Sequence, residues 1–260
     1  MTNKEYHALT THISNSGLSL VHKDTKKYWN KYLNPNRIEE TQTPALLLGS
    51  AFHSLTLEPL KFVDEFAVLP EGIDRRSNAG KLAYAEFELK ASGKGIINAE
   101  TYRIIQAMKE SVLGHKSAMR LLEAGVAEET FLYELDGVKC KCRPDFITVD
   151  DIIVDLKTTA DASPDDFTRS ITTFRYHVQN AFYVDGVKAV TDKELKFCFI
   201  AVEKTEPYDV AVYYLNSQAV DKGREIYLKD LAIYKECLES GIWFTDNIME
   251  LNLPQWAYNQ

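Results

Sequence analysis

The features that would place this chain in a membrane or an oxidising compartment are missing from its sequence. The first residues, MTNKEYHALTTHIS, have no positively charged segment followed by an apolar run, and nowhere do about twenty apolar residues follow one another as a membrane span requires. Of only four cysteines, Cys140 and Cys142 are too close along one predicted strand to suggest a structural disulfide. We therefore expect a cytoplasmic protein with no membrane partner.

A basic excess is also missing. The chain has 30 Lys and Arg residues against 38 Asp and Glu residues, a net charge of −8, whereas phosphate contacts need Lys and Arg. This balance does not exclude a nucleic-acid substrate, because a nuclease that binds metal through carboxylates has an acidic site. The basic residues form three clusters, Lys23/Lys26/Lys27/Lys31, Arg75/Arg76/Lys81 and Lys139/Lys141/Arg143. A solvated surface is the commoner explanation of any one such cluster.

Linkers, internal repeats and low-complexity tracts are absent as well. The 12 Gly and 8 Pro residues are scattered singly, and no segment is long enough to separate two independent domains. With 260 residues and 45% hydrophobic content the chain can bury a large core without disulfides. We therefore expect residues 1–260 to form a single domain.

The spacing of apolar residues predicts an α/β fold with a helical N-terminal part. Helical spacing predicts helices over 14–33, 45–57, 81–89, 100–122, 177–190 and 217–238, the first capped by Ser14 or Asn15. Alternation predicts strands over 130–135, 138–142, 152–158, 196–203 and 208–215. A tight turn at Asp136-Gly137 is expected to join the first two strands, and a turn near Asp150-Asp151 the next two.

Two carboxylates and an amine are expected to meet on the strand over 152–158. Its two-residue period puts Asp155 and Lys157 on one face. Asp145 and Asp155 lie symmetrically about position 150, so a three-residue loop at 149–151 would place them directly across a hairpin. Two carboxylates held that close repel unless a cation lies between them. An ordinary surface ion pair of Lys157 with either Asp is the alternative.

This combination fits hydrolysis of a phosphodiester. A hard cation held by oxygen ligands polarises the phosphate and lowers the pKa of bound water, and a nearby amine orients or deprotonates that water. A D-x-K triplet is common by itself, but Asp155-Leu-Lys157 preceded by Pro-Asp at this spacing favours a nuclease.

Two helical motifs add candidate site residues. Gly49 and His53 are four apart and share a face of the helix over 45–57, so His53 could bind a metal through neutral imidazole or contact a phosphate. Gln179 and Tyr183 have the same spacing on the helix over 177–190, where they could hold the scissile phosphate or its water. Ordinary packing is the alternative for His53 and Tyr183.

Together these motifs resemble the RecB-like branch of the PD-(D/E)xK nuclease superfamily: GxxxH at 49–53, PD at 144–145, DxK at 155–157 and QxxxY at 179–183. The chain is similar, more closely, to the nuclease domains of the exonuclease VIII (RecE) family, also over 75–81, 140–145, 155–161 and 176–183. The likeness spans most of the chain, from Tyr6-His7 to 253–256. It implies a restriction-endonuclease-like core, a central mixed sheet flanked by helices.

The resemblance implies a role for each motif residue. Those implied to bind the metal are His53, Asp145, Asp155 and the carbonyl oxygen of Leu156. Lys157 is implied to activate water, and Gln179 and Tyr183 to contact the phosphate or support the metal ligands. A further acidic residue is expected just before the first strand, at Glu128 or at Glu129. We expect no iron–sulfur cluster, because the four cysteines do not have the spacing that holds one in many RecB-branch nucleases.

The resemblance also implies an activity. It is that of a magnesium-dependent exonuclease, with manganese as another candidate metal, which digests double-stranded DNA from 5′ ends and leaves 3′ overhangs for recombination by strand annealing. Such enzymes work as ring-shaped homo-oligomers, here expected to be a tetramer, with a single-strand annealing protein of the RecT type. The alternatives are an inactive DNA-binding scaffold and an endonuclease with the same core.

The residues expected to bind DNA are Arg75, Arg76, Asn78, Lys81 and Arg143. The loop at 75–78 precedes a helix and combines guanidinium groups with free backbone N–H groups, which suits a 5′ phosphate. A ring would put the basic clusters on its inner wall and the acidic excess outside. Aromatic residues that could contact neighbouring subunits, unless they are buried in the core, are Tyr28, Trp29, Tyr32, Trp243 and Trp256.

Overall fold

The centre of the molecule is a mixed five-stranded sheet. The structure is a computed structural model and describes residues 1–38, 42–244, 248 and 250–259. The sheet has the order β3-β6-β7-β8-β9, with β3 (Gly125–Ala127), β6 (Phe146–Thr148), β7 (Ile152–Thr159), β8 (Lys196–Glu203) and β9 (Val210–Tyr213). β7 and β8 are parallel and the other neighbours antiparallel, so the predicted mixed sheet is confirmed.

Two smaller sheets lie outside the central one. β1 (Phe66–Leu69) pairs in parallel with β2 (Gly95–Asn98). β4 (Phe131–Leu135) and β5 (Val138–Cys142) form an antiparallel hairpin. Asp136 and Gly137 both have positive φ, 49° and 78°, which matches the twist of a tight hairpin. The predicted turn at these two residues is confirmed.

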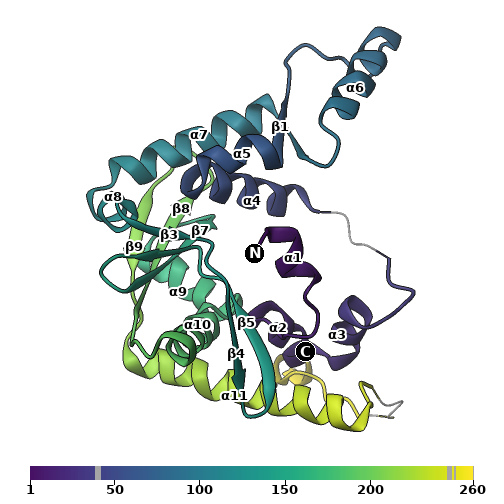
Figure 1. Cartoon of the computed structure of the whole chain (residues 1–260). Helices are drawn as coiled ribbons and strands as arrows, with labels where there is room; N and C mark the ends of the chain where they lie inside the picture. The colour runs from purple at the N-terminus through teal and green to yellow at the C-terminus, as the bar shows by residue number, and fades with distance from the viewer. Residues whose placement is uncertain (39–41, 245–247, 249, 260) are drawn as a thin grey trace.

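Helices cover both faces of the sheet (Figure 1). Their bounds are α1 (Asn3–Ala8), α2 (Asn15–Lys23), α3 (Thr25–Tyr32), α4 (Pro44–Leu57), α5 (Pro59–Glu65), α6 (Asn78–Lys90), α7 (Ala99–Gly114), α8 (Lys116–Leu122), α9 (Pro164–Thr173), α10 (Tyr176–Thr191) and α11 (Ser217–Ser240), followed by the short 3-10 helix Gln255–Asn259. α4, α5 and α7 lie above the sheet in Figure 1, α10 and α11 lie below it, and α6 projects from the rest. Within the described ranges, none of these helices has the length and apolarity to cross a bilayer.

Alternation along β7 divides the apolar core in two. Val154 and Leu156 pack on the side of α4 and α7, whereas Ile153 packs on the side of α10. Asp155 and Lys157 follow Ile153 at two-residue steps, so the strand turns them toward α10. The larger buried side chains of the first side are Phe52, Phe62, Ile105, Met108 and Ile200.

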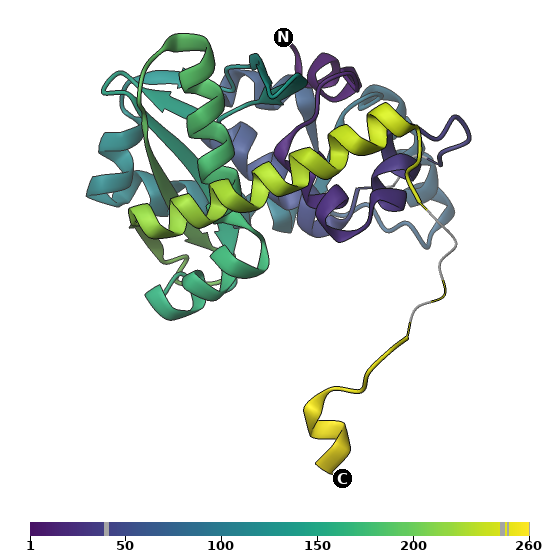
Figure 2. The ribbon, with the colours of Figure 1, turned by 90° about the horizontal axis from the view of Figure 1, so that it is seen from below.

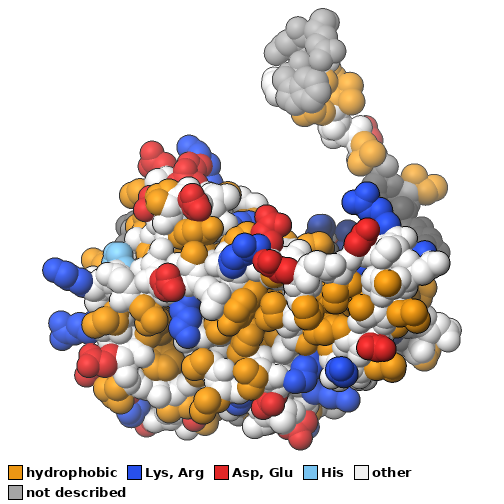
Figure 3. Space-filling model, turned by 90° about the horizontal axis from the view of Figure 1, so that it is seen from above, with side chains coloured by type: hydrophobic (Ala, Val, Ile, Leu, Met, Phe, Trp, Pro, Cys, Tyr) orange, Lys and Arg blue, Asp and Glu red, His pale blue; other side chains and the backbone are white. Residues whose placement is uncertain are grey.

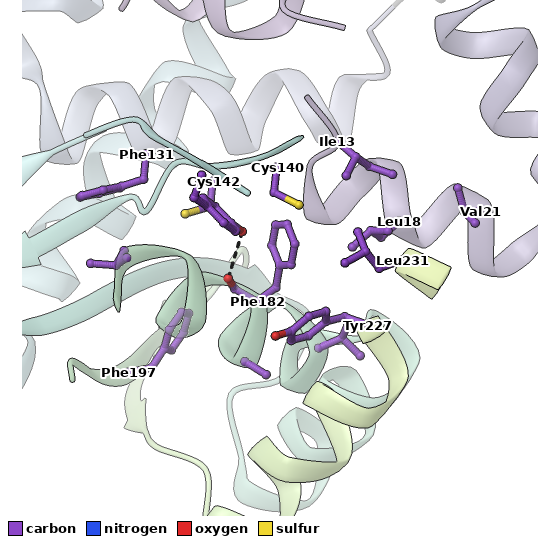
Figure 4. Packing of buried hydrophobic residues seen from close by; sticks show 14 of the residues in the cluster. Ile13, Leu18, Val21, Phe131, Cys140, Cys142, Phe182, Phe197, Tyr227 and Leu231 are labelled. Carbon is purple, nitrogen blue, oxygen red and sulfur yellow. Dashed lines mark hydrogen bonds between the residues drawn. The ribbon is translucent and has the colours of Figure 1, made fainter. Parts of the chain in front are cut away.

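The core on the α10 side joins distant parts of the chain (Figure 4). Phe182 of α10 is fully buried there with Leu18, Cys140 and Tyr227. The Tyr133 hydroxyl donates a hydrogen bond of 3.3 Å to the Phe182 carbonyl oxygen. α11 runs along the outside of α10 and also contacts α2 (Figure 2). The N-terminal helices are therefore part of the body that carries the sheet.

Two long predicted helices are interrupted. The helix expected over 14–33 is divided at Asp24, whose extended backbone ends α2 and whose carboxylate caps α3. The helix expected over 100–122 is divided at His115, which ends α7 and caps α8 through its ring. Of the two predicted caps, Ser14 is the N-cap of α2 and accepts a hydrogen bond from the Gly17 N–H. A single polar residue can thus break an otherwise continuous apolar period.

One strand pairing differs from the prediction. The turn near Asp150-Asp151 does not join β5 to β7, because β7 pairs with the unpredicted three-residue strand β6. β5 leaves the central sheet and belongs to the β4 hairpin. Other elements, α1, α5, β1, β2 and β3, are likewise not predicted, since so few residues do not establish a period. The ten-residue helix α9 is also not predicted.

The aromatic residues proposed as subunit contacts are largely internal. Tyr28 and Trp243 are 2% and 7% exposed, and their rings stack at 5.2 Å. Trp29 and Tyr32 are half-buried against the same core. The side chain of Trp256 lies outside the described residues. Burial in the core, the alternative given above, therefore holds for Tyr28 and Trp243.

Candidate active site

Asp145 precedes β6 and lies across the hairpin from β7. The β6–β7 register pairs Phe146 with Val154 and Ile147 with Ile153, so one further step places Asp145 opposite Asp155, as the symmetry about position 150 predicts. Asp145 Oδ2 accepts a hydrogen bond of 2.8 Å from the Leu156 backbone N–H. This carboxylate is therefore fixed to the strand that carries the D-x-K triplet.

Asp155 is the centre of a buried polar group. Its side chain is fully buried; Lys157 Nζ lies 2.5 Å from Oδ2, and Gln179 Nε2 donates to Oδ1 at 2.6 Å. Burial raises the pKa of Asp155 to about 6, with Lys157 opposing this rise and Asp145 adding to it. Burial also acts to lower the pKa of Lys157, but Asp155 and Asp145 outweigh it and raise the pKa. Lys157 is therefore an ammonium group.

A second acidic group lies next to Asp145. His53, Glu128 and Asp145 each offer a ligand atom, and these atoms lie within 4.8 Å of one another. His53 Nδ1 is 3.4 Å from Asp145 Oδ2. Burial, and next the charge of Asp145, raises the pKa of Glu128 to about 8, although Arg143 opposes them. The structure thus brings Glu128 to the cluster, whereas Glu129 points to solvent.

Glu128 reaches the cluster through an unusual backbone conformation. Its φ is +55°, in the left-handed region that residues other than glycine seldom adopt. Its N–H donates to the Asp145 carbonyl oxygen at 3.0 Å. Arg143 Nε lies 3.0 Å from both the carbonyl oxygen and Oε2 of Glu128. These contacts offset the backbone strain and aim the carboxylate at His53 and Asp145.

The donor atoms fit a divalent cation that prefers oxygen ligands. Carboxylates and one imidazole converge, and the Leu156 carbonyl projects from β7 toward the same edge as its N–H, which meets Asp145. Asp155 Oδ2 is buried and lies 2.5 Å from Lys157 Nζ, its charged partner. Such hard donors suit Mg²⁺ or Mn²⁺. The structure brings His53 and Asp145 together and ties Asp145 to Leu156, and metal binding by His53, Asp145, Asp155 and Leu156 stays a prediction.

A pocket of about 1100 Å³ opens beside the acidic cluster. His53, Glu128, Thr158 and Tyr183 line it. Tyr183 is one turn after Gln179 on α10, and burial raises its pKa well above the ordinary value. Its hydroxyl therefore keeps its proton and can donate a hydrogen bond into the pocket.

The helix α1 forms one wall of this pocket. Lys141 Nζ donates to the Tyr6 and Leu9 carbonyl oxygens at 2.5 and 2.7 Å. Arg143 Nη2 donates to the Met1 carbonyl oxygen at 3.2 Å. Strand β5 and the residue just after it thus hold the N-terminal helix against the site. Sequence reasoning missed this wall, although buried basic side chains such as Lys141 and Arg143 must meet acceptors.

Arg143, predicted to bind DNA, is largely buried. Its guanidinium is occupied by Glu128 and by the Met1 carbonyl oxygen. The structure shows it as a support for a carboxylate of the cluster, so a contact with DNA stays a prediction. Lys141 is also buried, so of the third basic cluster only Lys139 is a solvated side chain.

The other residues predicted to bind DNA lie away from the carboxylates. Arg75, Arg76, Asn78 and Lys81 lie on an arm formed by α6 and the loop before it (Figure 1). The guanidinium of Arg75 lies 4.0 Å from the centre of the Tyr84 ring. Arg76 is almost fully exposed. The arm thus projects away from the acidic site and holds basic and acidic side chains in equal number over residues 71–90.

Charges of both signs are mixed on the face seen from above. Lys and Arg side chains alternate there with Asp and Glu side chains, and hydrophobic side chains lie between them (Figure 3). Among the described residues of this face, Lys and Arg side chains form no continuous patch, so their arrangement does not mark a path for a polyanion.

A family model covers nearly the whole chain. The model described as PDDEXK-like domain of unknown function (DUF3799) matches residues 15–245. This range contains every predicted catalytic and metal-binding residue. A comparison of the sequence with curated proteins finds no match.

Several solved structures are similar to this one. The crystal structure of a candidate exonuclease from Eubacterium rectale is 16% identical, covers 99% of this chain and 97% of its own, and has a TM-score of 0.65. A phage-related exonuclease from Haemophilus somnus 129PT is 12% identical and covers 74% of this chain and 95% of its own, with a TM-score of 0.35. The alkaline exonuclease LHK-Exo from Laribacter hongkongensis is 14% identical and covers 75% and 95%, with a TM-score of 0.28. Because the last two scores are low, the likeness in fold rests on the first structure.

Proposed function

The chain belongs to the family of PDDEXK-like domains (DUF3799), and from that premise we propose that it is a metal-dependent exodeoxyribonuclease. The observation that carries the proposal is the convergence of His53, Glu128 and Asp145 beside the buried pair of Asp155 and Lys157. An ordinary surface ion pair would leave Asp155 exposed, whereas its side chain is fully buried. Such a carboxylate is retained at a cost in stability, which is typical of a functional site.

The metal ligands proposed are His53, Glu128, Asp145, Asp155 and the Leu156 carbonyl oxygen, with Mg²⁺ as the first candidate and Mn²⁺ as the second. When bound, the ion would polarise the phosphate and lower the pKa of a bound water. Asp145 is held by the Leu156 N–H, and Glu128 by Arg143. The chain thus fixes the ligands before the substrate arrives, which avoids reorganisation during the reaction.

Lys157 is proposed to orient the attacking water and to attract the phosphate. Its ammonium has three donors, of which Asp155 takes one. Because the neighbouring carboxylates raise its pKa, it acts as a charged donor. Gln179 holds Asp155 from the other side. The Tyr183 hydroxyl, which keeps its proton, donates to a phosphate oxygen in the pocket.

The finer features of the proposal rest on the motifs that resemble the exonuclease VIII (RecE) family. These features are digestion from 5′ ends, 3′ overhangs for recombination, a homo-oligomeric ring of four chains and an annealing partner of the RecT type. The structure from Eubacterium rectale is that of a candidate exonuclease, which agrees with this class of activity.

One assay tests the activity. Linear duplex labelled at either the 5′ or the 3′ end, and covalently closed circular duplex, are incubated with the purified protein in Mg²⁺ or in EDTA. We expect only linear DNA to be digested, only with Mg²⁺, and with early release of the 5′ label. Cleavage of the closed circle would instead support an endonuclease. Binding of ends without digestion in either Mg²⁺ or Mn²⁺ would support the inactive scaffold.

Assembly is tested separately by light scattering. A ring predicts a mass several times the 29.6 kDa of one chain, and digestion of a long duplex that persists after excess competitor DNA is added. A monomeric mass together with immediate arrest by competitor contradicts the ring and leaves the catalytic proposal standing.

A further inference from the structure

The turn between α9 and α10 presents an aromatic ring to solvent next to the site. Phe174 is 62% exposed. Its inner face stacks on Tyr176, with ring centres 5.6 Å apart and planes 27° apart. A single exposed apolar side chain is common on protein surfaces and needs no explanation by itself. Three further observations set Phe174 apart.

The first is its link to the catalytic amine. Lys157 Nζ lies 4.7 Å from the centre of the Tyr176 ring. Tyr176 therefore has Lys157 as one neighbour and Phe174 as another, so only one ring separates the exposed aromatic from the ammonium proposed to attract the phosphate. Phe174 is thus connected to Lys157 through a single ring contact on each side of Tyr176.

The second is that Tyr176 cannot easily move. Its ring also lies 5.9 Å from that of Phe199 and 6.1 Å from that of Phe167, both fully buried in the core. An aromatic row thus runs from the core through Tyr176 to Phe174, which makes Phe174 the outer end of a fixed row.

The third is the anchor under the turn. Arg175, which lies between Phe174 and Tyr176 in the sequence, has a φ of +61°, a strained conformation for this residue. Its guanidinium pairs with Asp230, which is 2% exposed and also lies 2.8 Å from His22 Nδ1. The Arg175 carbonyl accepts from the N–H groups of Val178 and Gln179 at 3.0 and 3.1 Å. The residue that turns Phe174 outward therefore also starts the helix that carries Gln179.

We propose that Phe174 is a stacking platform for a nucleobase of the DNA strand whose phosphate lies at Lys157. This inference rests on the proposed function and adds a binding residue to the same site. Base stacking on an aromatic ring tolerates every sequence, because each base has a π-face. It suits an enzyme that must hold successive nucleotides of any sequence, and it gives a use to a ring whose outer face is open. Arg175 acts as a positioning residue that keeps the ring in place.

Binding measurements with altered DNA test the platform directly. The probe is a duplex oligonucleotide with a short single-stranded end, bound in Ca²⁺ in place of Mg²⁺ to suppress cutting, with one abasic nucleotide at each position of the end in turn. Phe174→Ala is expected to weaken binding of intact DNA roughly 5- to 100-fold, and Phe174→Tyr to stay within about 2-fold of the parent. Melting temperatures near that of the parent verify that the variants fold, which the exposure of Phe174 leads us to expect.

The decisive result is coupling between the ring and one base. At one position, the abasic nucleotide should weaken binding by the parent by the same factor as Phe174→Ala does, and should weaken binding by Phe174→Ala no further. The matched control is Tyr214→Ala, which removes another aromatic that is 80% exposed and should bind like the parent. Losses that add at every position, or Phe174→Ala binding within about 2-fold of the parent, overturn the platform.

The two proposals fail in different ways. A parent protein that digests DNA together with a Phe174→Ala variant of equal affinity removes only the platform. A parent that neither binds nor digests DNA removes the nuclease and the platform with it.

Discussion

The acidic site and the α6 arm are built in opposite ways. At the site, side chains are held by residues far away in the sequence: Gln179 donates to Asp155, and His53 lies beside Asp145. On the arm the contacts are local, since the Arg76 N–H donates to Asp74 and Ser77 caps α6. The arm's basic side chains stay exposed. Groups that act on a reacting phosphate need fixed positions, whereas groups that attract a polyanion need only charge and access.

This contrast predicts two kinds of response to substitution. Removal of a group at the site should abolish the reaction with little dependence on salt. Removal of a group on the arm should change binding by a small factor that shrinks as salt rises.

The largest loss of activity is expected at β7. Asp155→Asn and Lys157→Ala should each lower the rate of duplex digestion by about 10²- to 10⁴-fold, because each removes a site group. Circular dichroism should show an intact fold, since neither change removes apolar core. The matched control is Asp151→Asn, which alters an exposed Asp paired with Lys193 at the start of the same strand. Digestion by Lys157→Ala at nearly the parent's rate would falsify the role given to Lys157.

The next effect separates the two adjacent glutamates. Glu128→Gln should weaken Mg²⁺ binding at least about 10-fold, because it removes a ligand from the cluster of His53 and Asp145. The matched control is Glu129→Gln, the same change at the adjacent, exposed glutamate. It should leave Mg²⁺ affinity unchanged. Calorimetric titration with Mg²⁺ measures both. Equal losses in the two variants would contradict the choice of Glu128.

Stability should depend on pH and metal together. Burial raises the pKa of Glu128 to about 8 and that of Asp155 to about 6, above the values of free carboxyls. Without metal, these two carboxyls bind their protons more tightly in the folded than in the unfolded chain. The free energy of unfolding of the metal-free protein is therefore highest at low pH and decreases as pH rises toward 8. Saturating Mg²⁺ should restore the melting temperature near pH 8 and release protons on binding. In EDTA the melting temperature should decrease as pH rises from about 5 to about 8, roughly the window of these pKa shifts. A constant melting temperature over this range would contradict raised pKa values for Glu128 and Asp155.

The smallest effect is expected on the arm. If Arg76 binds a 5′ phosphate, Arg76→Ala should lower the preference for 5′-phosphorylated over 5′-hydroxyl ends a few-fold, about 1 kcal/mol, and less at high salt. Arg103→Ala, which removes an exposed arginine paired with Glu71, is the matched control. Equal rates on both ends, or a preference that Arg76→Ala leaves unaltered, would remove the 5′-phosphate pocket.

The strand and helix periods predicted much of the site from the sequence. Alternation along β7 placed Asp155 and Lys157 on one face, and the symmetry about position 150 placed Asp145 opposite Asp155. Helical spacing put His53 on α4 and put Gln179 and Tyr183 on α10. These predictions succeeded because each depends on a regular period within one or two elements.

The remaining parts depend on contacts that no local period reveals. The choice of Glu128 over Glu129 follows from a left-handed backbone held by Asp145 and Arg143. The loss of β5 from the central sheet depends on β6, which is three residues long. In both cases the deciding interaction lies in tertiary structure, which overrides local preference.

The hydrogen bonds from Lys141 and Arg143 to the N-terminal segment affect the order in which the pocket folds and locally unfolds. Lys141 and Arg143 reach back to Tyr6, Leu9 and Met1 across more than 130 positions of the chain, so that wall closes a very long loop. Closing such a loop costs chain entropy, and the contacts that offset this cost can form only after β5 has folded. We therefore expect α1 to join the fold late. α1 has six residues, of which only Tyr6 is buried, so it should also be the first part of the pocket to exchange its amide hydrogens with solvent. The pocket would then open by local unfolding of α1, while the residues of the acidic cluster keep their positions.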